Sequence, residues 1–285
     1  MKIGALIAGV NSNVSADNCA ELNAKFQWLK DMGMDNCQIN FGNAEGYTEE
    51  NARLIKECAE KHGIEITALW CGAACGYGPC DWGHYYGPTT NGLVPPEYRQ
   101  MRVEVLKKGA RFAKAMGITD VIYHSGFIPE YPASTEFKSF IGCMKYLAGY
   151  YKSLGMRYLF ETGQETPLTL LRTIIEIGTG NVGINLDPSD LITDGKGNPV
   201  DALKTFGKYV WGIHAKDGTI PTEEDYIHGG YQCRVGEGDV DFPALINKLK
   251  EIGYDGALTI EREDTDEEQK RIDIINAKEY LEKLI

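Results

Sequence analysis

The sequence predicts a (β/α)8 barrel, and three observations lead to that expectation. One connection recurs along the chain, in which an amphipathic stretch ends in glycine and an apolar run follows within a few residues. Each apolar run is rich in β-forming residues and is followed in turn by a helix-like stretch. The 285 residues contain no Pro- or Ser-rich linker and no shift in composition, which favours a single domain spanning residues 1–285.

The apolar runs supply the eight predicted strands. The first is the N-terminal run 2–10, KIGALIAGV, which has one lysine and no small-residue cleavage site and is therefore expected to be a strand rather than a signal peptide. The other runs lie within residues 32–41, 61–70, 116–125, 154–161, 178–187, 206–215 and 252–261. A glycine at the start of each is expected to be the left-handed residue that closes the preceding helix: Gly33, Gly63, Gly117, Gly155, Gly180, Gly207 and Gly253.

Two further features bear on the fold. No glycine-rich nucleotide turn follows any strand, so an open doubly wound sheet is the less favoured α/β alternative. The longest irregular segment runs from about Cys71 to Pro96 and is rich in glycine, proline and aromatic residues. Because a loop of this length in a compact domain is usually a lid or a binding loop, we expect it to border a site.

Composition excludes several partners. A net charge of −12 and a pI near 5.0 argue against nucleic acid, and no apolar run approaches the ~18 residues of a membrane helix. Eight cysteines without a secretion signal are expected to be reduced thiols of a cytoplasmic protein. Cys71, Cys75, Cys80 and His84 could be drawn as a zinc site, but their spacing lacks the C-x2-C pairs of structural zinc sites and disfavours it.

Polar residues end most of the predicted strands, where a (β/α)8 enzyme has its active site. The second strand ends in Gln38 and Asn40, the third in Trp70 and the fourth in His124. The last four strands end, in order, in Glu161, Asp187, His214 and Glu261. Each of the last four has an ordinary explanation by itself, as a solvated charge, a helix cap or a hydrogen-bonded histidine. The ordinary explanations do not account for the four residues together, because neighbouring parallel strands lie ~4.8 Å apart and their ends converge on one small volume.

Three carboxylates in one small volume would repel one another and resist burial unless a cation compensated them. The mixed oxygen and nitrogen donors therefore predict one divalent metal ion, Mn²⁺, Mg²⁺, Co²⁺ or Zn²⁺.

The chain resembles the xylose isomerase-like TIM barrels, a superfamily of sugar and sugar phosphate isomerases and epimerases. The resemblance covers the whole chain in architecture and is most specific in YLFETGQET, GINLDPSDL, GIHAKDG, RVGEGDVDF and GYDGALTIERE, within residues 158–263. It implies that Glu161, Asp187, His214 and Glu261 bind the metal. As in the ketose 3-epimerases, it also implies that Glu161 and Glu261 act as the acid/base pair.

The same resemblance implies that Arg234 lies near the substrate hydroxyls, and that Gln164 and Glu165 lie where the family often contacts sugar. The chain departs from the epimerases at Asp190, where they usually carry the histidine of Asp-x-x-His. Related AP endonucleases need that histidine and several more, so a three-metal nuclease site is unsupported in a chain with five histidines.

Other candidates come from position alone, and each keeps a structural alternative. His124 would hydrogen-bond substrate or a metal-bound water, or be a satisfied structural histidine. Lys216 lies two residues beyond His214, on the same side of the strand, and would bind an anionic or phosphate group or pair with a ligand carboxylate. Aromatic side chains would stack on a sugar face or pack the long loop on itself: Trp70, Tyr77, Trp82, Tyr85 and Tyr86.

Two glutamates, Glu261 and Glu263, lie at the end of the last strand and just beyond it, and we expect them to have different roles. Leu258 and Ile260 are expected to face the helices, which leaves Glu261 aimed at the barrel mouth. Glu263 has the same parity but lies beyond the strand, so it is expected to support the site or lie on the surface. Arg262 is expected to turn outward and pair with an acid on a helix.

The predicted function is a divalent-metal-dependent isomerase or epimerase that removes a proton next to the carbonyl of a sugar or sugar phosphate, through a metal-stabilised enediolate. An inosose-type dehydratase, a metal-dependent hydrolase and a non-catalytic sugar-binding barrel stay as alternatives. A small carbohydrate is the expected partner, and a homo-oligomer is compatible with the sequence.

Overall fold

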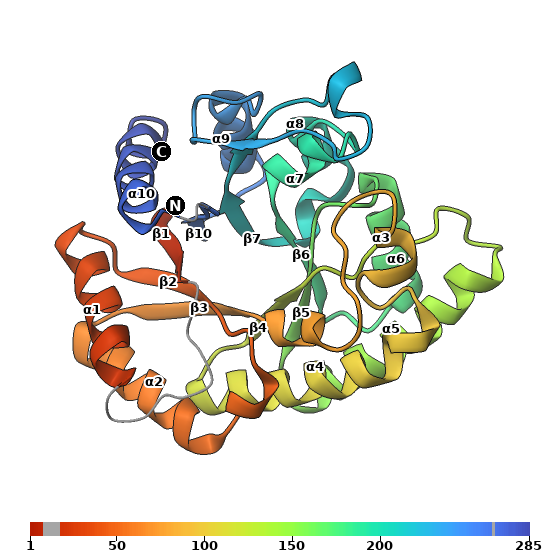
Figure 1. Cartoon of the computed structure of the whole chain (residues 1–285), viewed down its shortest axis with the longest axis horizontal. Coiled ribbons are helices and arrows are strands. Elements are labelled where there is room, and N and C mark those ends of the chain that lie inside the picture. Colours follow the sequence, from red (N-terminus) through yellow and green to blue (C-terminus); the bar gives the residue numbers. More distant parts are fainter. Residues whose placement is uncertain (8–17, 264–265) are drawn as a thin grey trace.

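In this computed structural model, eight parallel strands form a closed barrel and helices surround it (Figure 1). The structure describes residues 1–7, 18–263 and 266–285. The barrel strands are β1 (Lys2–Ile7), β2 (Asn36–Asn40), β3 (Glu65–Trp70), β4 (Asp120–Tyr123), β5 (Arg157–Glu161), β6 (Val182–Leu186), β7 (Val210–Ala215) and β10 (Ala257–Ile260). Because β1 pairs with both β2 and β10, the sheet has no free edge, which confirms the predicted (β/α)8 fold.

Helices alternate with the strands along the chain. The longer ones are α1 (Asn18–Asp31), α2 (Glu49–His62), α4 (Pro96–Met116), α5 (Thr135–Ser153), α6 (Pro167–Ile177), α8 (Pro199–Phe206), α9 (Phe242–Glu251) and α10 (Glu267–Glu282). Several begin at a side chain that accepts a hydrogen bond from the first turn, including Thr48, Ser134, Thr166 and Asp241. Shorter elements are α3 (Gly87–Thr90), α7 (Pro188–Thr193) and an antiparallel pair, β8 (Asp217–Gly218) with β9 (Gln232–Cys233).

Six of the seven predicted helix-closing glycines have the left-handed backbone, with φ between 62° and 85°. Gly207 was predicted wrongly, because its φ is −50° and the chain continues into a 3-10 turn, η3 (Gly207–Tyr209), which needs no left-handed residue. Gly180 is left-handed, but the residue that caps α6 is Gly178, two positions earlier. Of the predicted first strand, residues 8–10 lie outside the described part of the chain.

Side chains alternate between the helix layer and the barrel interior. On β5, Tyr158 and Phe160 belong to the large core between strands and helices. Leu159 lies instead in a small apolar cluster with Ala68 and Ile122. A position two residues after an interior residue is again interior, so Glu161 follows Leu159 into the barrel. The alternation therefore aims the last polar residue of a strand at the barrel mouth.

The long segment between β3 and α4 is organised around Arg102 of α4, which is fully buried. Its guanidinium donates hydrogen bonds to four backbone carbonyl oxygens of that segment: those of Tyr77 (3.1 Å), Pro79 (2.8 Å), Thr90 (2.7 Å) and Gly92 (2.6 Å). A short 3-10 helix, η2 (Gly72–Gly76), and α3 lie within the segment. The predicted irregular loop is therefore held by one side chain at several points along its length.

Candidate metal centre

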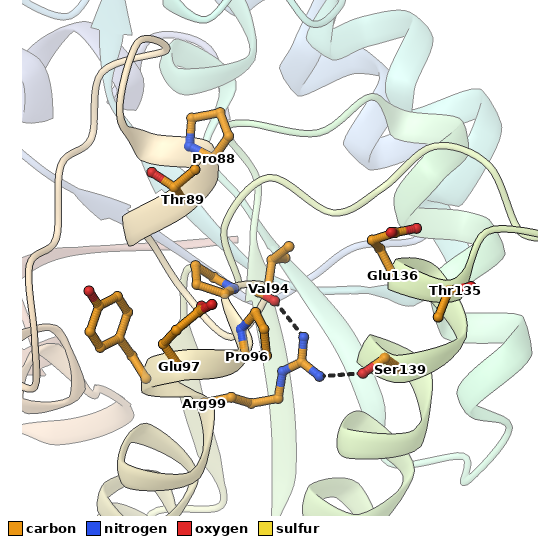
Figure 2. A pocket seen from close by; sticks show the side chains of 11 residues that line it. Pro88, Thr89, Val94, Pro96, Glu97, Arg99, Thr135, Glu136 and Ser139 are labelled. Carbon is orange, nitrogen blue, oxygen red and sulfur yellow. Dashed lines mark hydrogen bonds between the residues drawn. The ribbon is translucent and has the colours of Figure 1, made fainter.

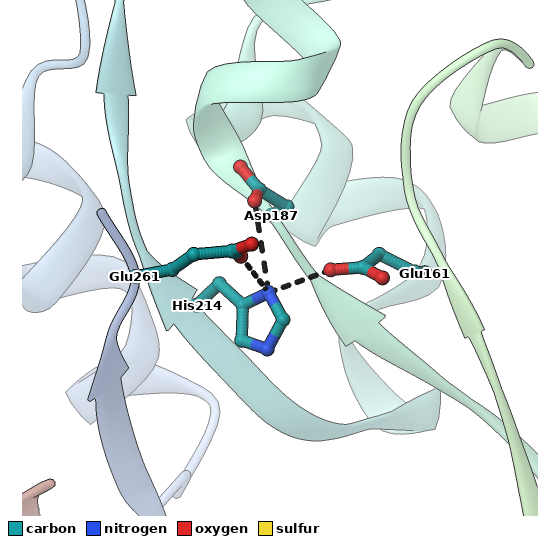
Figure 3. Close-up of side chains that lie close together, drawn as sticks. All are labelled: Glu161, Asp187, His214 and Glu261. Atoms are coloured by element: carbon teal, nitrogen blue, oxygen red, sulfur yellow. Dashed lines mark ion pairs between the residues drawn. The ribbon is translucent and has the colours of Figure 1, made fainter. Parts of the chain in front are cut away.

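Four buried side chains meet at the C-terminal mouth of the barrel (Figure 3). Glu161 ends β5, Asp187 follows β6, His214 lies on β7 and Glu261 follows β10. One ligand atom from each lies within 4.8 Å of the ligand atoms of the other three. The sequence alone predicted this convergence, and among the described residues this is the set of acids, histidines and cysteines close enough to hold a metal ion.

The imidazole of His214 lies at the centre of the cluster. Its Nδ1 is 2.6 Å from Glu161 Oε1, 2.6 Å from Glu261 Oε2 and 3.7 Å from Asp187 Oδ2. Asp187 has two functions, since its Oδ1 accepts a hydrogen bond from the backbone N–H of Asp190 (3.1 Å) and caps α7. Its Oδ2 is left for the cluster.

Gln38 of β2 determines which nitrogen of His214 faces the acids. The Nε2 of His214 lies 2.7 Å from Gln38 Oε1, while Gln38 Nε2 donates to Asn185 Oδ1 at 3.3 Å. Because the amide oxygen can only accept, Nε2 of the histidine carries a proton. Nδ1 is then the nitrogen that faces the acids: the surrounding carboxylates, acting against burial, raise the pKa of His214 and favour a proton on Nδ1, and a bound cation would take that proton's place. Gln38 was noted as a strand-end residue, but its role was not predicted.

Replacing Gln38 by methionine is expected to weaken metal binding by about 10- to 100-fold, because His214 loses the acceptor that orients it. The measurement is calorimetric titration of the metal-free protein with Mn²⁺ or Co²⁺. Ile39→Val is the matched control on the opposite face of β2, where the side chain is fully buried in the outer core. It should lower the free energy of unfolding by about 1 kcal/mol and leave metal affinity unchanged.

The charges in the cluster are strongly coupled. Burial opposes ionisation of Glu161, but His124 and His214 outweigh it and lower the pKa of this glutamate. Burial likewise opposes ionisation of Glu261, and Lys216 together with His214 lowers its pKa. Burial and the nearby Asp190 raise the pKa of Asp187 to about 8. The two glutamates are therefore ionised at neutral pH, whereas Asp187 resists ionisation without a further cation.

These residues fit a divalent metal ion. Asp187 Oδ2 is buried without a hydrogen-bond partner, and His214 Nδ1 and Glu261 Oε2 are buried with only the other atoms of the cluster as partners, an arrangement that is costly unless a cation binds among them. Three carboxylates and one imidazole form a mixed oxygen and nitrogen donor set suited to Mn²⁺, Mg²⁺, Co²⁺ or Zn²⁺.

A cavity of 580 Å³ opens above the cluster. Its lining includes Glu161 and Glu261 together with Trp70, Asp81, Trp82, Gly83, His124, Gln164, Asp190, Thr193, Asp194, Lys216, His228 and Glu263. Several of these residues were not singled out in the sequence. Asp190 and Asp194 come from α7 and its C-terminal cap, and their i, i+4 spacing in DPSDLITD was a signal that both would face the same side.

Lys216 is buried among acids at the edge of the cluster. Its Nζ lies 3.1 Å from Asp190 Oδ1, 3.5 Å from Glu263 Oε2, 3.7 Å from Asp187 Oδ2 and 3.9 Å from Glu261 Oε1. Asp190, the position at which the sequence resemblance implied a histidine, thus pairs with a lysine. The ion pairs with ligand carboxylates correspond to the structural alternative for Lys216, and binding of an anionic group stays a prediction.

His124 and two tryptophans surround the outer side of Glu161. His124 Nε2 lies 3.2 Å from Glu161 Oε2 and 3.6 Å from Asp190 Oδ2, and the Trp70 indole N–H donates to Glu161 Oε2. Trp82 from the long loop packs edge-on against His124, with ring centroids 5.0 Å apart. These contacts fix the position of the Glu161 carboxylate and supply an aromatic wall to the cavity.

Other predicted residues lie outside this cavity lining. Arg234 pairs with Asp273 of α10 at 2.8 Å, and its side chain is 44% exposed. Glu165 is buried, and burial together with Asp194 raises its pKa well above the usual value. Tyr85 and Tyr86 are exposed and pack against each other.

The zinc site considered from the sequence, formed by three cysteines and His84, receives no support from the described residues. Cys71 is buried and its sulfur contacts the Tyr47 hydroxyl at 3.1 Å, whereas the nearest acid to His84 is Asp194, 3.9 Å away. Cys71, Cys75, Cys80 and His84 are not among the groups close enough to hold an ion.

A second cavity of 490 Å³ lies where α4 and α5 begin, beside α3 (Figure 2). Arg99 crosses it, donating from Nη1 to Ser139 Oγ at 2.7 Å and from Nη2 to the carbonyl of Val94. None of the predicted site residues lines it. We therefore regard the cavity over the strand ends as the candidate active site.

No helix within the described residues is both long and apolar enough to span a membrane. A model of the xylose isomerase-like TIM barrel family matches residues 26–284. The crystal structure of a xylose isomerase domain protein from Planctomyces limnophilus is similar, with 30% identity, a TM-score of 0.85 and coverage of 99% of this chain and 96% of that one.

Two curated proteins are also similar. An uncharacterized protein of Methanocaldococcus jannaschii is 28% identical over 65% of this chain, a match that spans only 64% of its own length. The 2-oxo-tetronate isomerase of Haemophilus influenzae is 23% identical over 74% of this chain and 77% of that protein. Ketose epimerases and a probable 3-DHS dehydratase share the fold at 14 to 21% identity, which is a likeness of fold alone.

Proposed function

Because the chain belongs to the xylose isomerase-like TIM barrel family, we propose that it is a metal-dependent isomerase or epimerase of a sugar or sugar phosphate. The observation that carries the proposal is the pair of buried glutamates, Glu161 and Glu261. They approach His214 Nδ1 from opposite sides, each at 2.6 Å (Figure 3). Two carboxylates on either side of one small volume match a reaction that takes a proton from one face of a carbon and returns it to the other.

Glu161, Asp187, His214 and Glu261 would hold the metal ion. When bound there, a divalent cation would polarise the substrate carbonyl and so make the neighbouring C–H bond more acidic. The buried, unpartnered Oδ2 of Asp187 and the enclosure of His214 Nδ1 among carboxylates support this assignment.

The chain's own groups prepare the two glutamates for proton transfer. Lys216 and His214, acting against burial, lower the pKa of Glu261 and keep it a carboxylate, which is the form that a base must have. Trp70 and His124 hold Glu161 Oε2 in place on the other side. Positioned acid/base groups of this kind typically contribute ~10²–10⁴-fold to the rate.

The substrate would lie in the 580 Å³ cavity, against Trp82, His124 and Gln164. Gln164 Oε1 is buried without a hydrogen-bond partner, so a substrate hydroxyl is a fitting donor for it. Arg234 and Glu165 stay predictions as substrate contacts, and so does Lys216 as an anion-binding group. Carbohydrate as the substrate class is supported by the sugar-modifying enzymes among the similar proteins.

The test is deuterium exchange. The Mn²⁺- or Co²⁺-loaded protein is incubated in D2O with a panel of ketoses, ketose phosphates and 2-oxo sugar acids, and products are read by NMR. We expect deuterium at the carbon next to the carbonyl, together with a new isomer or epimer. Metal-dependent binding without exchange would support a non-catalytic sugar-binding barrel and overturn the proposal.

A dehydratase is the second candidate, because it begins with the same proton abstraction and a probable dehydratase shares the fold. A dehydratase would remove water from the substrate, and the dicarbonyl product would be detected by its ultraviolet absorbance. Cytoplasmic location, a single domain over residues 1–285 and a homo-oligomeric state stay proposals beside either activity.

A further inference from the structure

The cavity above the proposed metal centre is strongly acidic. Within the part of the chain that the structure describes, its lining contains six carboxylates, one lysine and no arginine. The carboxylates are those of Asp81, Glu161, Asp190, Asp194, Glu261 and Glu263. The two charges of a bound divalent ion would still leave carboxylates in excess. A phosphate or carboxylate group that enters this cavity therefore meets like charge unless a cation is available to bind it.

The lysine of this lining, Lys216, already has its charge balanced. Two of its four carboxylate neighbours, Asp187 and Glu261, are proposed metal ligands. A third, Glu263, lies 3.5 Å away and is 66% exposed, so its contact is screened by water. Asp190 is the nearest, with Oδ1 3.1 Å from Lys216 Nζ, and its side chain is only 17% exposed. Asp190 is therefore the residue that takes up the charge of Lys216.

Asp190 also contacts the other group of the cavity that could bind an anion. Its Oδ2 lies 3.6 Å from His124 Nε2, which in turn lies 3.2 Å from Glu161 Oε2. Because the backbone N–H of Asp190 donates to Asp187 Oδ1 at 3.1 Å, the carboxylate is held at the start of α7. Lys216 and His124 thus both face carboxylates of the protein.

The remaining groups of the cavity favour a ligand that donates hydrogen bonds. Gln164 Oε1 is buried without a hydrogen-bond partner, and Asp81, Asp194 and Glu263 add oxygens that can only accept when ionised. A sugar hydroxyl can donate to each of them, whereas the oxygens of a phosphate dianion can only accept. The unpartnered Gln164 oxygen is satisfied only by a ligand that brings a donor.

We propose that Asp190 determines substrate specificity: by neutralising Lys216 it makes the cavity select uncharged, polyhydroxylated substrates and reject phosphorylated or carboxylated ones. Discrimination of this kind depends on a repulsive element as well as on attractive contacts. The inference rests on the proposed function for the place of the substrate in this cavity, and it narrows the substrate class of that function. It contradicts the anion-binding alternative for Lys216.

The test compares neutral ketoses with their phosphate esters. The full-length, Mn²⁺-loaded protein is titrated by calorimetry with D-fructose, D-allulose and D-tagatose, and with the 6-phosphate of each. We expect the ketose that binds best to have a Kd at least about tenfold lower than that of its own 6-phosphate, because the ester brings two negative charges into an acidic cavity.

Variants of α7 then assign the discrimination to one residue. Asp190→Asn keeps the backbone N–H and frees Lys216, so affinity for the 6-phosphate relative to the ketose should rise about tenfold or more. Asp194→Asn is the matched control, because it removes a carboxylate of the same cavity whose ion-pair partner among the described residues is His84, at 3.9 Å. It should change the ratio less than about threefold. Adding Lys216→Met to Asp190→Asn should abolish the gain.

The wild-type comparison needs no variant, and thermal unfolding checks that each variant is folded. Binding of a 6-phosphate as tightly as its ketose, or of neither ligand, would overturn the proposal. Equal gains in Asp190→Asn and Asp194→Asn would contradict it as well, because total charge rather than the pairing of Lys216 would then exclude anions. Failure of the proposed isomerase or epimerase activity is seen separately, as a ketose that binds without deuterium exchange.

Discussion

Replacing Glu261 by glutamine is expected to lower the rate of deuterium exchange by about 10²- to 10⁴-fold, because an amide cannot accept the substrate proton. The amide oxygen can still serve as a metal ligand, so the variant should bind Mn²⁺ at saturating concentration. The measurement is exchange into the best ketose of the panel, with metal content determined on the same sample. Exchange at the wild-type rate with metal bound would show that another group takes the proton.

Glu263→Gln is the matched comparison for this experiment. Glu263 lies two residues further along the chain and contacts Lys216 at 3.5 Å, but its side chain is 66% exposed. An ion pair with one exposed partner contributes at most about 1 kcal/mol, so the exchange rate should change by no more than a few-fold. Equal losses in the two variants would contradict the distinct roles assigned to Glu261 and Glu263.

Asp187→Asn is expected to remove metal binding and to lower activity by about a thousandfold or more, because the metal ion contributes several kcal/mol to such reactions. Asparagine keeps an oxygen that can cap α7, as Asp187 Oδ1 does now. It places an N–H donor where Oδ2 faces His214, and that donor cannot bind a cation. The metal-free variant should be as stable as the metal-free wild type, because burial and Asp190 already disfavour the charge on Asp187.

The companion variant Asp187→Ala removes the cap as well as the ligand. It should lose metal binding in the same way and in addition about 1 kcal/mol of stability. Metal content after gel filtration and thermal unfolding with and without Mn²⁺ distinguish the two effects. A metal-dependent rise in Tm that survives in Asp187→Asn would show that Asp187 is not a ligand.

The strands and the convergence of their ends could be predicted because both depend on short-range pattern. Alternation along β10 is enough to put Leu258 and Ile260 in the outer core and Glu261 at the mouth. The outward turn of Arg262 is also confirmed, since its Nε donates to Asp273 of α10 at 2.8 Å. Gly207 was misjudged because a 3-10 turn and a left-handed cap both use glycine after an amphipathic stretch.

Roles that need the closed barrel could not be predicted. Gln38 and His214 are 176 residues apart and come from β2 and β7, which are separated in the barrel by β1 and β10. Their contact crosses the barrel interior and leaves no local signature in the sequence. Lys216 is a similar case, because its partner Asp190 comes from α7, beyond the neighbouring strand. The pairing of Arg234 with Asp273 also depends on how a loop meets a distant helix.

The buried guanidinium of Arg102 has a consequence for ligand affinity. It ties Tyr77, Pro79, Thr90 and Gly92 to α4 in the protein without substrate. The part of the chain that carries Trp82 into the cavity is therefore already ordered before a ligand arrives. Freezing a mobile segment on binding would consume interaction energy as lost conformational entropy. In this protein the entropy of that segment is lost during folding. The free energy of ligand contacts with Trp82 therefore contributes to the binding constant without a deduction for ordering the segment.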